Sequence, residues 1–142
     1  MLYNVSYNDP ETRRLIENDV GRVLSLRERW KLKGSGSPKL HITSSSIQIH
    51  NLLVVDNSLN VCNIELREKG IIVRFRSRLQ TFALPIPYFK LNIYKGRAEE
   101  YSIYRDNYWV KVKADRKPIH DFFKKINQQK GDSGFEYVDD LC

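Results

Sequence analysis

The sequence has only two cysteines and three histidines among its 142 residues, and neither type is concentrated in one segment. Cys62 falls in a strand-like stretch and Cys142 is the last residue, which argues against a disulfide framework. His41, His50 and His120 stand far apart, and none has the spacing of a metal ligand relative to Cys62. We therefore expect no metal site and no other cofactor.

Long apolar runs are also missing. The longest covers residues 52–55, whereas a helix that crosses a bilayer needs roughly 20 apolar residues. The first residues read MLYNVSYNDPETRR and contain no charged segment followed by an apolar one, so no secretory signal is expected. We expect a cytoplasmic protein with no transmembrane segment.

Motifs of the common enzyme classes are absent from the sequence. It contains no G-x-S-x-G elbow, no P-loop and no G-x-G-x-x-G after a strand. Glu99 and Glu100 are adjacent, but neighbouring residues of a strand point to opposite faces. The sequence therefore predicts a protein that is not an enzyme, since a catalytic site would have to be assembled entirely from residues distant in sequence.

Basic residues exceed acidic ones, and the net charge is +7. Residues 1–39 hold eight Lys or Arg against five Asp or Glu, residues 40–131 hold sixteen against eight, and residues 132–142 hold four acids and no base. A basic body attracts nucleic acid or anionic lipid headgroups. A charge of this size is also ordinary for the solvated surface of a small domain, so both interpretations stay open.

The N-terminal part is expected to be helical. Asp9, Pro10 and Glu11 have the pattern of a helix start. From there a helix can run toward Trp30, although Gly21 weakens it; its apolar stripe would be Leu15, Ile16, Val20, Val23 and Leu24. Gly, Ser and Pro at 34–38 form a break. We interpret 1–33 as a helical arm and 34–39 as a linker.

Between residues 40 and 114, short segments alternate apolar and polar residues with period two, as β-strands do. Six expected strands lie at 61–66, 71–78, 81–86, 90–94, 100–104 and 108–113, and residues 41–43 and 47–55 together supply one or two more. Gly70 is expected to supply the positive φ of a tight turn, and Asp106 and Asn107 to turn the last hairpin. Pro85 and Pro87 indicate a strand end or a sheet edge.

A closing helix is predicted over 117–129, with Pro118 in its first turn and Asp115 as its cap. Its apolar face, at i, i+3, i+4 and i+7, consists of Ile119, Phe122, Phe123 and Ile126, with Lys124 and Lys125 opposite. Such a helix can plug one end of a curled sheet. The expected fold is mainly β with flanking helices, an open barrel or β-sandwich capped by this C-terminal helix.

Three segments resemble the pleckstrin-homology-like superfold, in particular small bacterial domains of the PH and GRAM-like type. Residues 64–73, IELREKGIIV, resemble the early hairpin of that family. Residues 82–91, FALPIPYFKL, resemble the segment in which a strand ends in an apolar residue, Pro and Tyr. Residues 118–126, PIHDFFKKI, resemble the closing helix. The resemblance covers about 45–128. It implies a PH-like domain at 40–131 and a binding scaffold rather than an enzyme. The residues at 132–142, which we interpret as an acidic tail from their charge, lie outside the resemblance.

In eukaryotic relatives, a basic cluster between the first two strands binds phosphoinositides. Here the corresponding turn is Glu68, Lys69 and Gly70, flanked by Arg67, which falls short of that pattern. The resemblance therefore does not imply specific phosphoinositide recognition.

The candidate ligand-binding residues are Arg67, Lys69, Arg74, Arg76, Arg78, Trp109, Lys111 and Lys113. Arginines that share one face of a strand repel one another unless an anion or an acidic residue lies nearby. Arginine forks suit phosphate, and an aromatic ring beside lysines suits a nucleic-acid base or a headgroup boundary. The same residues would also fit an ordinary solvated face that pairs with Glu65 and the acidic tail.

Two functions are therefore predicted. The first is a non-catalytic module that binds a protein partner or its own copies, through an exposed strand edge or the arm at 1–33. The alternative is binding of nucleic acid or an anionic membrane surface through the basic strand faces. The acidic tail favours the first, because it would shield a basic face. Trp30 is costly to leave in water, so we expect the arm to pack against the domain or to reach a neighbour.

Overall fold

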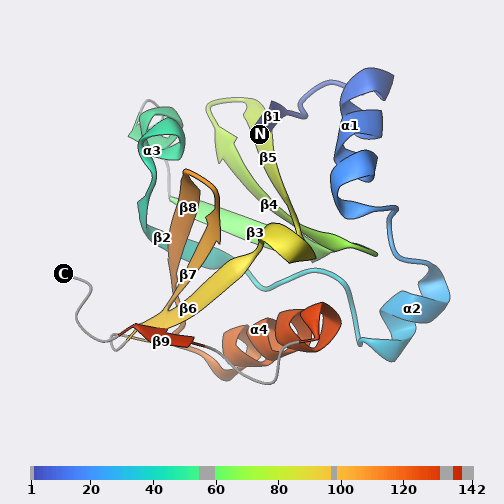
Figure 1. The fold of residues 1–142 in the computed structure, drawn as a ribbon. Coiled ribbons are helices and arrows are strands. Elements are labelled where there is room, and N and C mark those ends of the chain that lie inside the picture. The colour runs from blue at the N-terminus through green and yellow to red at the C-terminus, as the bar shows by residue number, and fades with distance from the viewer. Residues whose placement is uncertain (1, 55–59, 97–98, 132–135, 139–142) are drawn as a thin grey trace.

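The computed structural model describes residues 2–54, 60–96, 99–131 and 136–138 (Figure 1). The strands are β1 (Tyr3–Asn4), β2 (Leu40–Ser45), β3 (Val61–Leu66), β4 (Gly70–Ser77), β5 (Gln80–Pro87), β6 (Asn92–Gly96), β7 (Glu100–Arg105), β8 (Tyr108–Lys113) and β9 (Glu136–Val138). The helices are α1 (Pro10–Val20), α2 (Leu26–Lys31), α3 (Ile47–Val54), the short 3-10 helix η1 (Tyr88–Lys90) and α4 (Lys117–Lys130).

Within the described residues, the strands form one sheet in the order β1-β5-β4-β3-β2-β8-β7-β6-β9. All neighbouring pairs are antiparallel except β6 and β9, which run parallel. The sheet curls at β2, whose Leu40 and His41 pair with β3 while Ile42, Ser44 and Ser45 pair with β8. A register shift between Ile42 and Ser44 accompanies this change of partner. The fold is thus a mainly antiparallel, open sheet with a C-terminal helix, as the sequence predicted.

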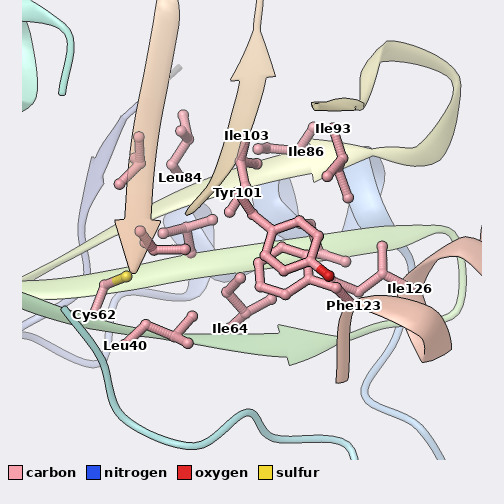
Figure 2. Packing of buried hydrophobic residues seen from close by; sticks show 14 of the residues in the cluster. Leu40, Cys62, Ile64, Leu84, Ile86, Ile93, Tyr101, Ile103, Phe123 and Ile126 are labelled. Atoms are coloured by element: carbon pink, nitrogen blue, oxygen red, sulfur yellow. The ribbon is translucent and has the colours of Figure 1, made fainter. Parts of the chain in front are cut away.

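The core lies between the two halves of the curled sheet and follows the predicted alternation. Its inward residues from β3 and β4 include Cys62, Ile64, Leu66, Ile71, Val73 and Phe75. The predicted apolar face of α4 closes this core, and Phe123 is completely buried. Figure 2 shows the Phe123 ring beside that of Tyr101. The two rings are stacked, with centroids 4.0 Å apart. The position and orientation of the closing helix were therefore predicted correctly.

The strand predicted within 47–55 is wrong, because residues Ile47–Val54 form helix α3 and Val55 lies outside the described residues. Ile47 and Ile49 alternate as in a strand, but the buried pair is Ile49 and Leu53, one helical turn apart. The carbonyl of Ser46 accepts the N–H of His50 at 2.8 Å, which starts the helical hydrogen bonds.

Two local predictions are also corrected. Gly70 does not have a positive φ. Instead, a Cβ at Gly70 would lie 2.3 Å from the carbonyl oxygen of Ile86, so close approach of the backbone requires glycine there. Asp115 does not cap α4, since the N-cap is Arg116 and makes no side-chain capping bond. The turn at Asp106 does adopt a left-handed φ of 53°, as expected.

The N-terminal arm contains two helices rather than one. Asp9 caps α1 as predicted, because its Oδ1 accepts the N–H of Glu11 at 3.1 Å. The helix ends at Gly21, whose φ is 82°. Ile16 and Val20 bury themselves in a small cluster with Ile72 and Ala83 on the outer face of β4 and β5. The first part of the arm therefore packs against its own domain, and β1 adds to the edge of β5.

The predicted linker at 34–39 runs beside β3 in the structure. The carbonyl of Ser35 accepts the N–H of Leu66 at 2.7 Å, and the N–H of Ser37 donates to the carbonyl of Ile64 at 2.8 Å. These bonds connect the end of α2 to the sheet, which gives α2 a defined place beside the domain.

Candidate interaction surfaces

The side chains with catalytic potential are dispersed. Burial raises the pKa of the Cys62 thiol to about 12, so the thiol is protonated at neutral pH. His120 lies with its Nδ1 2.8 Å from the hydroxyl of the buried Tyr101, while His41 and His50 are exposed elsewhere. In the described part of the chain, no group of three or more His, Cys, Asp and Glu side chains could hold a metal ion.

Arg67 and Arg74 both bind Glu65 on the outer face of β3 and β4. The Nε of Arg67 donates to Glu65 Oε2 at 2.5 Å, and Nη1 of Arg74 donates to Glu65 Oε1. Arg67 is only 9% exposed and also donates to the carbonyl of Gly21 at 3.3 Å. Burial by itself raises the pKa of Glu65, but the two arginines outweigh it and the net pKa is lowered. These arginines thus form an internal ion-pair cluster that also ties the end of α1 to the sheet.

A cavity of about 380 Å³ opens beside this cluster, between the segment around Tyr7 and the sheet. Arg13, Arg67 and Arg74 contribute positive charge to its wall, and Asp9 and Glu17 contribute negative charge. With Glu65 included, the acids equal the arginines in number. The charges at and beside the cavity therefore balance, and its wall also includes the apolar residues Val5, Ile16 and Val23.

Three other basic residues predicted on the first half of the sheet are exposed to solvent. Arg76 and Arg78 have exposed side chains, and Arg78 sits in the turn after β4 with a φ of 57°. Lys69 is also exposed, and its N–H donates to the carbonyl of Val20 at 2.7 Å. Of Arg74, Arg76 and Arg78, which were predicted as ligand-binding residues, Arg74 pairs with Glu65 and the other two have exposed side chains.

The remaining predicted residues, Trp109, Lys111 and Lys113, share the outer face of β8. Lys113 lies 3.8 Å from Asp115. Trp109 faces Tyr104 across the β7–β8 pair, with ring centroids 6.1 Å apart. Tyr104 in turn contacts Tyr94 of β6, with centroids 5.5 Å apart. Neither tyrosine was among the candidate residues predicted from the sequence, although both lie in predicted strands.

Helix α2 presents apolar side chains to solvent. Leu26 is 79% exposed and Trp30 is 83% exposed, and they lie one turn apart on the helix. No residue of α2 is buried. A capping box nevertheless fixes its start, since Ser25 accepts the N–H of Glu28 and Glu28 accepts that of Ser25. Trp30 therefore does not pack against its own domain, and the alternative, that this part of the arm reaches a neighbour, stays a prediction.

Comparisons with protein-family models, curated proteins and solved structures return no match. No helix of the described residues has the length and apolar character of a membrane span. The function must therefore be inferred from the surfaces themselves.

Proposed function

We propose that this protein is a non-catalytic, PH-like binding module that docks a protein partner through the exposed side chains of α2. The fold part of the proposal is supported by the strand order. A meander from β2 to β8 returns to pair its last strand with its first, and the apolar face of α4 is buried in its core. This arrangement matches the curled sheet and closing helix that the resemblance implies.

The observation that carries the binding role is the exposure of Trp30 beside Leu26 on a helix that the capping box holds in shape. Exposing a tryptophan side chain to water costs free energy. A helix that is already formed before binding also loses less entropy when the partner binds. Tryptophan and arginine are enriched among the residues that dominate protein–protein affinity. The segment that contains this pair also carries exposed or half-exposed basic residues: Arg22, Arg27, Arg29, Lys31 and Lys33.

The charge around α2 indicates the kind of partner. Two copies of this basic segment would repel each other, and the whole chain carries +7. A partner with an apolar pocket and an acidic rim would complement both features. We therefore propose a different protein rather than a second copy as the partner.

The test is capture of partners from cells of the native host by the full chain and by Trp30→Glu. Phe89→Glu serves as the matched control, because Phe89 is 84% exposed but lies in η1, outside α2. A purified partner that binds wild type and the control should bind Trp30→Ala about 30-fold more weakly or worse, as expected for a hot-spot tryptophan. Equal binding by all variants would refute the role of α2. If Trp30→Glu instead lost binding to lipid vesicles and kept binding to proteins, the exposed side chains of α2 would be identified as a membrane contact.

A further inference from the structure

The outer face of β6, β7 and β8 carries three aromatic side chains that the strand register places together. Trp109 lies opposite Tyr104, and the next outward position along β6 and β7 pairs Tyr94 with Ser102. We call Tyr94, Tyr104 and Trp109 the aromatic row. The rings contact in sequence, Tyr94 edge-on to Tyr104 at 80° and Tyr104 near-parallel to Trp109 at 30°. Each ring supports its neighbour, which restricts the motion of all three.

The aromatic row is accessible. All three side chains are partly exposed. Among the described helices, α1 packs on β4 and β5, α3 packs on β2 and β4, and the apolar face of α4 points into the core. The main contacts of α1 and α3 and the apolar face of α4 are therefore directed elsewhere than to this face of β6, β7 and β8.

The neighbours of the aromatic row are polar and include a lysine. Lys111 sits between Ser44 and Ser102 in the register and is partly exposed. Lys113 faces Glu100 and also lies near Asp115, so its charge is largely balanced. Lys111 is therefore the cation best placed to meet a phosphate beside the rings, and the rings must supply most of the binding energy.

We propose that this face is a stacking surface for single-stranded nucleic acid, distinct from the protein-binding surface of α2. Aromatic side chains on an open sheet can stack on unpaired bases, whose faces are hidden in a duplex. Such stacking tolerates any sequence, because every base has a π-face. The excess of sixteen basic over eight acidic residues at 40–131 favours a polyanion over a neutral ligand.

The experiment uses the full chain carrying Trp30→Phe, so that Trp109 is its single tryptophan. The probe is a 15-nucleotide oligo-dT, added at about 50 mM salt. Stacking should quench the fluorescence of Trp109 as the oligonucleotide binds. In a fluorescence-anisotropy assay with labelled oligo-dT, Trp109→Ala and Tyr94→Ala should each weaken binding roughly 5- to 150-fold, the range typical for loss of one stacked base. Trp109→Phe should retain most of the affinity, and Phe89→Ala should retain all of it.

Salt dependence separates stacking from general attraction to charge. Each phosphate contact to a single strand contributes a slope of about −0.7 in log K against log salt, so Lys111→Ala should reduce the slope by about that amount. The proposal would be overturned if oligo-dT did not bind. It would also be overturned if oligo-dT bound without quenching Trp109 fluorescence and with the same affinity in both alanine variants. Equally tight binding of duplex DNA, or of anionic vesicles in place of oligo-dT, would also overturn it. Circular dichroism of each variant shows whether the sheet is intact, and Trp109→Phe keeps the test decisive if an alanine variant unfolds.

Discussion

Arg105 and Asp19 form an ion pair that joins β7 to α1 across 86 residues of sequence, with Nη1 of Arg105 donating to Asp19 Oδ2 at 3.1 Å. Arg105 is buried and also donates to the carbonyl of Pro85 in β5. One arginine thus contacts α1 and β5 from the opposite half of the curled sheet. It complements the apolar cluster that holds α1 in place, and it explains why the first helix of the arm stays with the domain.

Asp19→Asn should therefore destabilise the protein by about 1–2 kcal/mol, because a buried guanidinium loses its charged acceptor. Glu17→Gln is the matched control, since Glu17 is an exposed carboxylate on the same helix, and it should change stability by less than about 0.5 kcal/mol. Urea unfolding of both variants measures the difference. Equal stabilities would show that the Arg105 contact does not hold α1.

Gly70→Ala should cost about 3 kcal/mol or more, because the new methyl group would meet Ile86, Pro87 and Val20 at 2.3–2.8 Å. A methyl group at Gly36 would have nothing within 4 Å, and Gly36 has no positive φ. Gly36→Ala should therefore be neutral or slightly stabilising. Equal melting temperatures of Gly70→Ala and Gly36→Ala in thermal melts would contradict the close approach of the backbone at Gly70.

Much of the fold was predictable from local patterns. Alternation located β3 and β4 and their inward residues, and the spacing of Phe122, Phe123 and Ile126 located the closing helix. The failure at α3 has a physical reason. Ile47 and Ile49 alternate like a strand, and only tertiary burial of Ile49 with Leu53 reveals the helix.

The candidate surfaces were less predictable, because they depend on register between strands. The sequence left open whether the basic residues bind a ligand or pair with Glu65, and the structure shows the pairing with Glu65 for Arg67 and Arg74. The sequence also did not show that Tyr94 and Tyr104 align with Trp109. Trp30 stands out in the sequence, but its exposure depends on where the chain turns after Gly21.

Glu65 should make stability depend on acid pH. Its pKa is lowered in the folded protein because the bonds from Arg74 and Arg67 outweigh the effect of burial. A lowered folded-state pKa stabilises the protein above the unfolded value near 4.5, and this stabilisation is lost as pH falls through the folded-state pKa. Glu65→Gln should be less stable than wild type at pH 7. The difference in unfolding free energy between wild type and Glu65→Gln should become smaller below about pH 4.5. A difference that stays constant down to acid unfolding would contradict a lowered pKa of Glu65.

Phe122→Ala should destabilise the protein by about 3–5 kcal/mol, because Phe122 is buried on the apolar face of α4. Lys124→Ala, an exposed change on the same helix, is the control and should have little effect. The measurement is chemical unfolding monitored by far-UV circular dichroism. Unchanged stability of Phe122→Ala would mean that α4 does not close the core in solution.

Cys62 should report the opening of that core. Its thiol is buried, and burial raises its pKa to about 12, so very little thiolate exists at pH 8 and the reagent has no access. In a Cys142→Ser background, Cys62 should react with a thiol reagent only from transiently unfolded molecules. When reclosing is fast, adding Phe122→Ala should accelerate labelling by the same factor by which it raises the equilibrium constant for unfolding, whereas Lys124→Ala should not change the rate. Rapid labelling of the native Cys142→Ser protein would show that Cys62 in β3 is not buried as described. A labelling rate that Phe122→Ala leaves unchanged would show that the opening of β3 does not depend on the packing of α4.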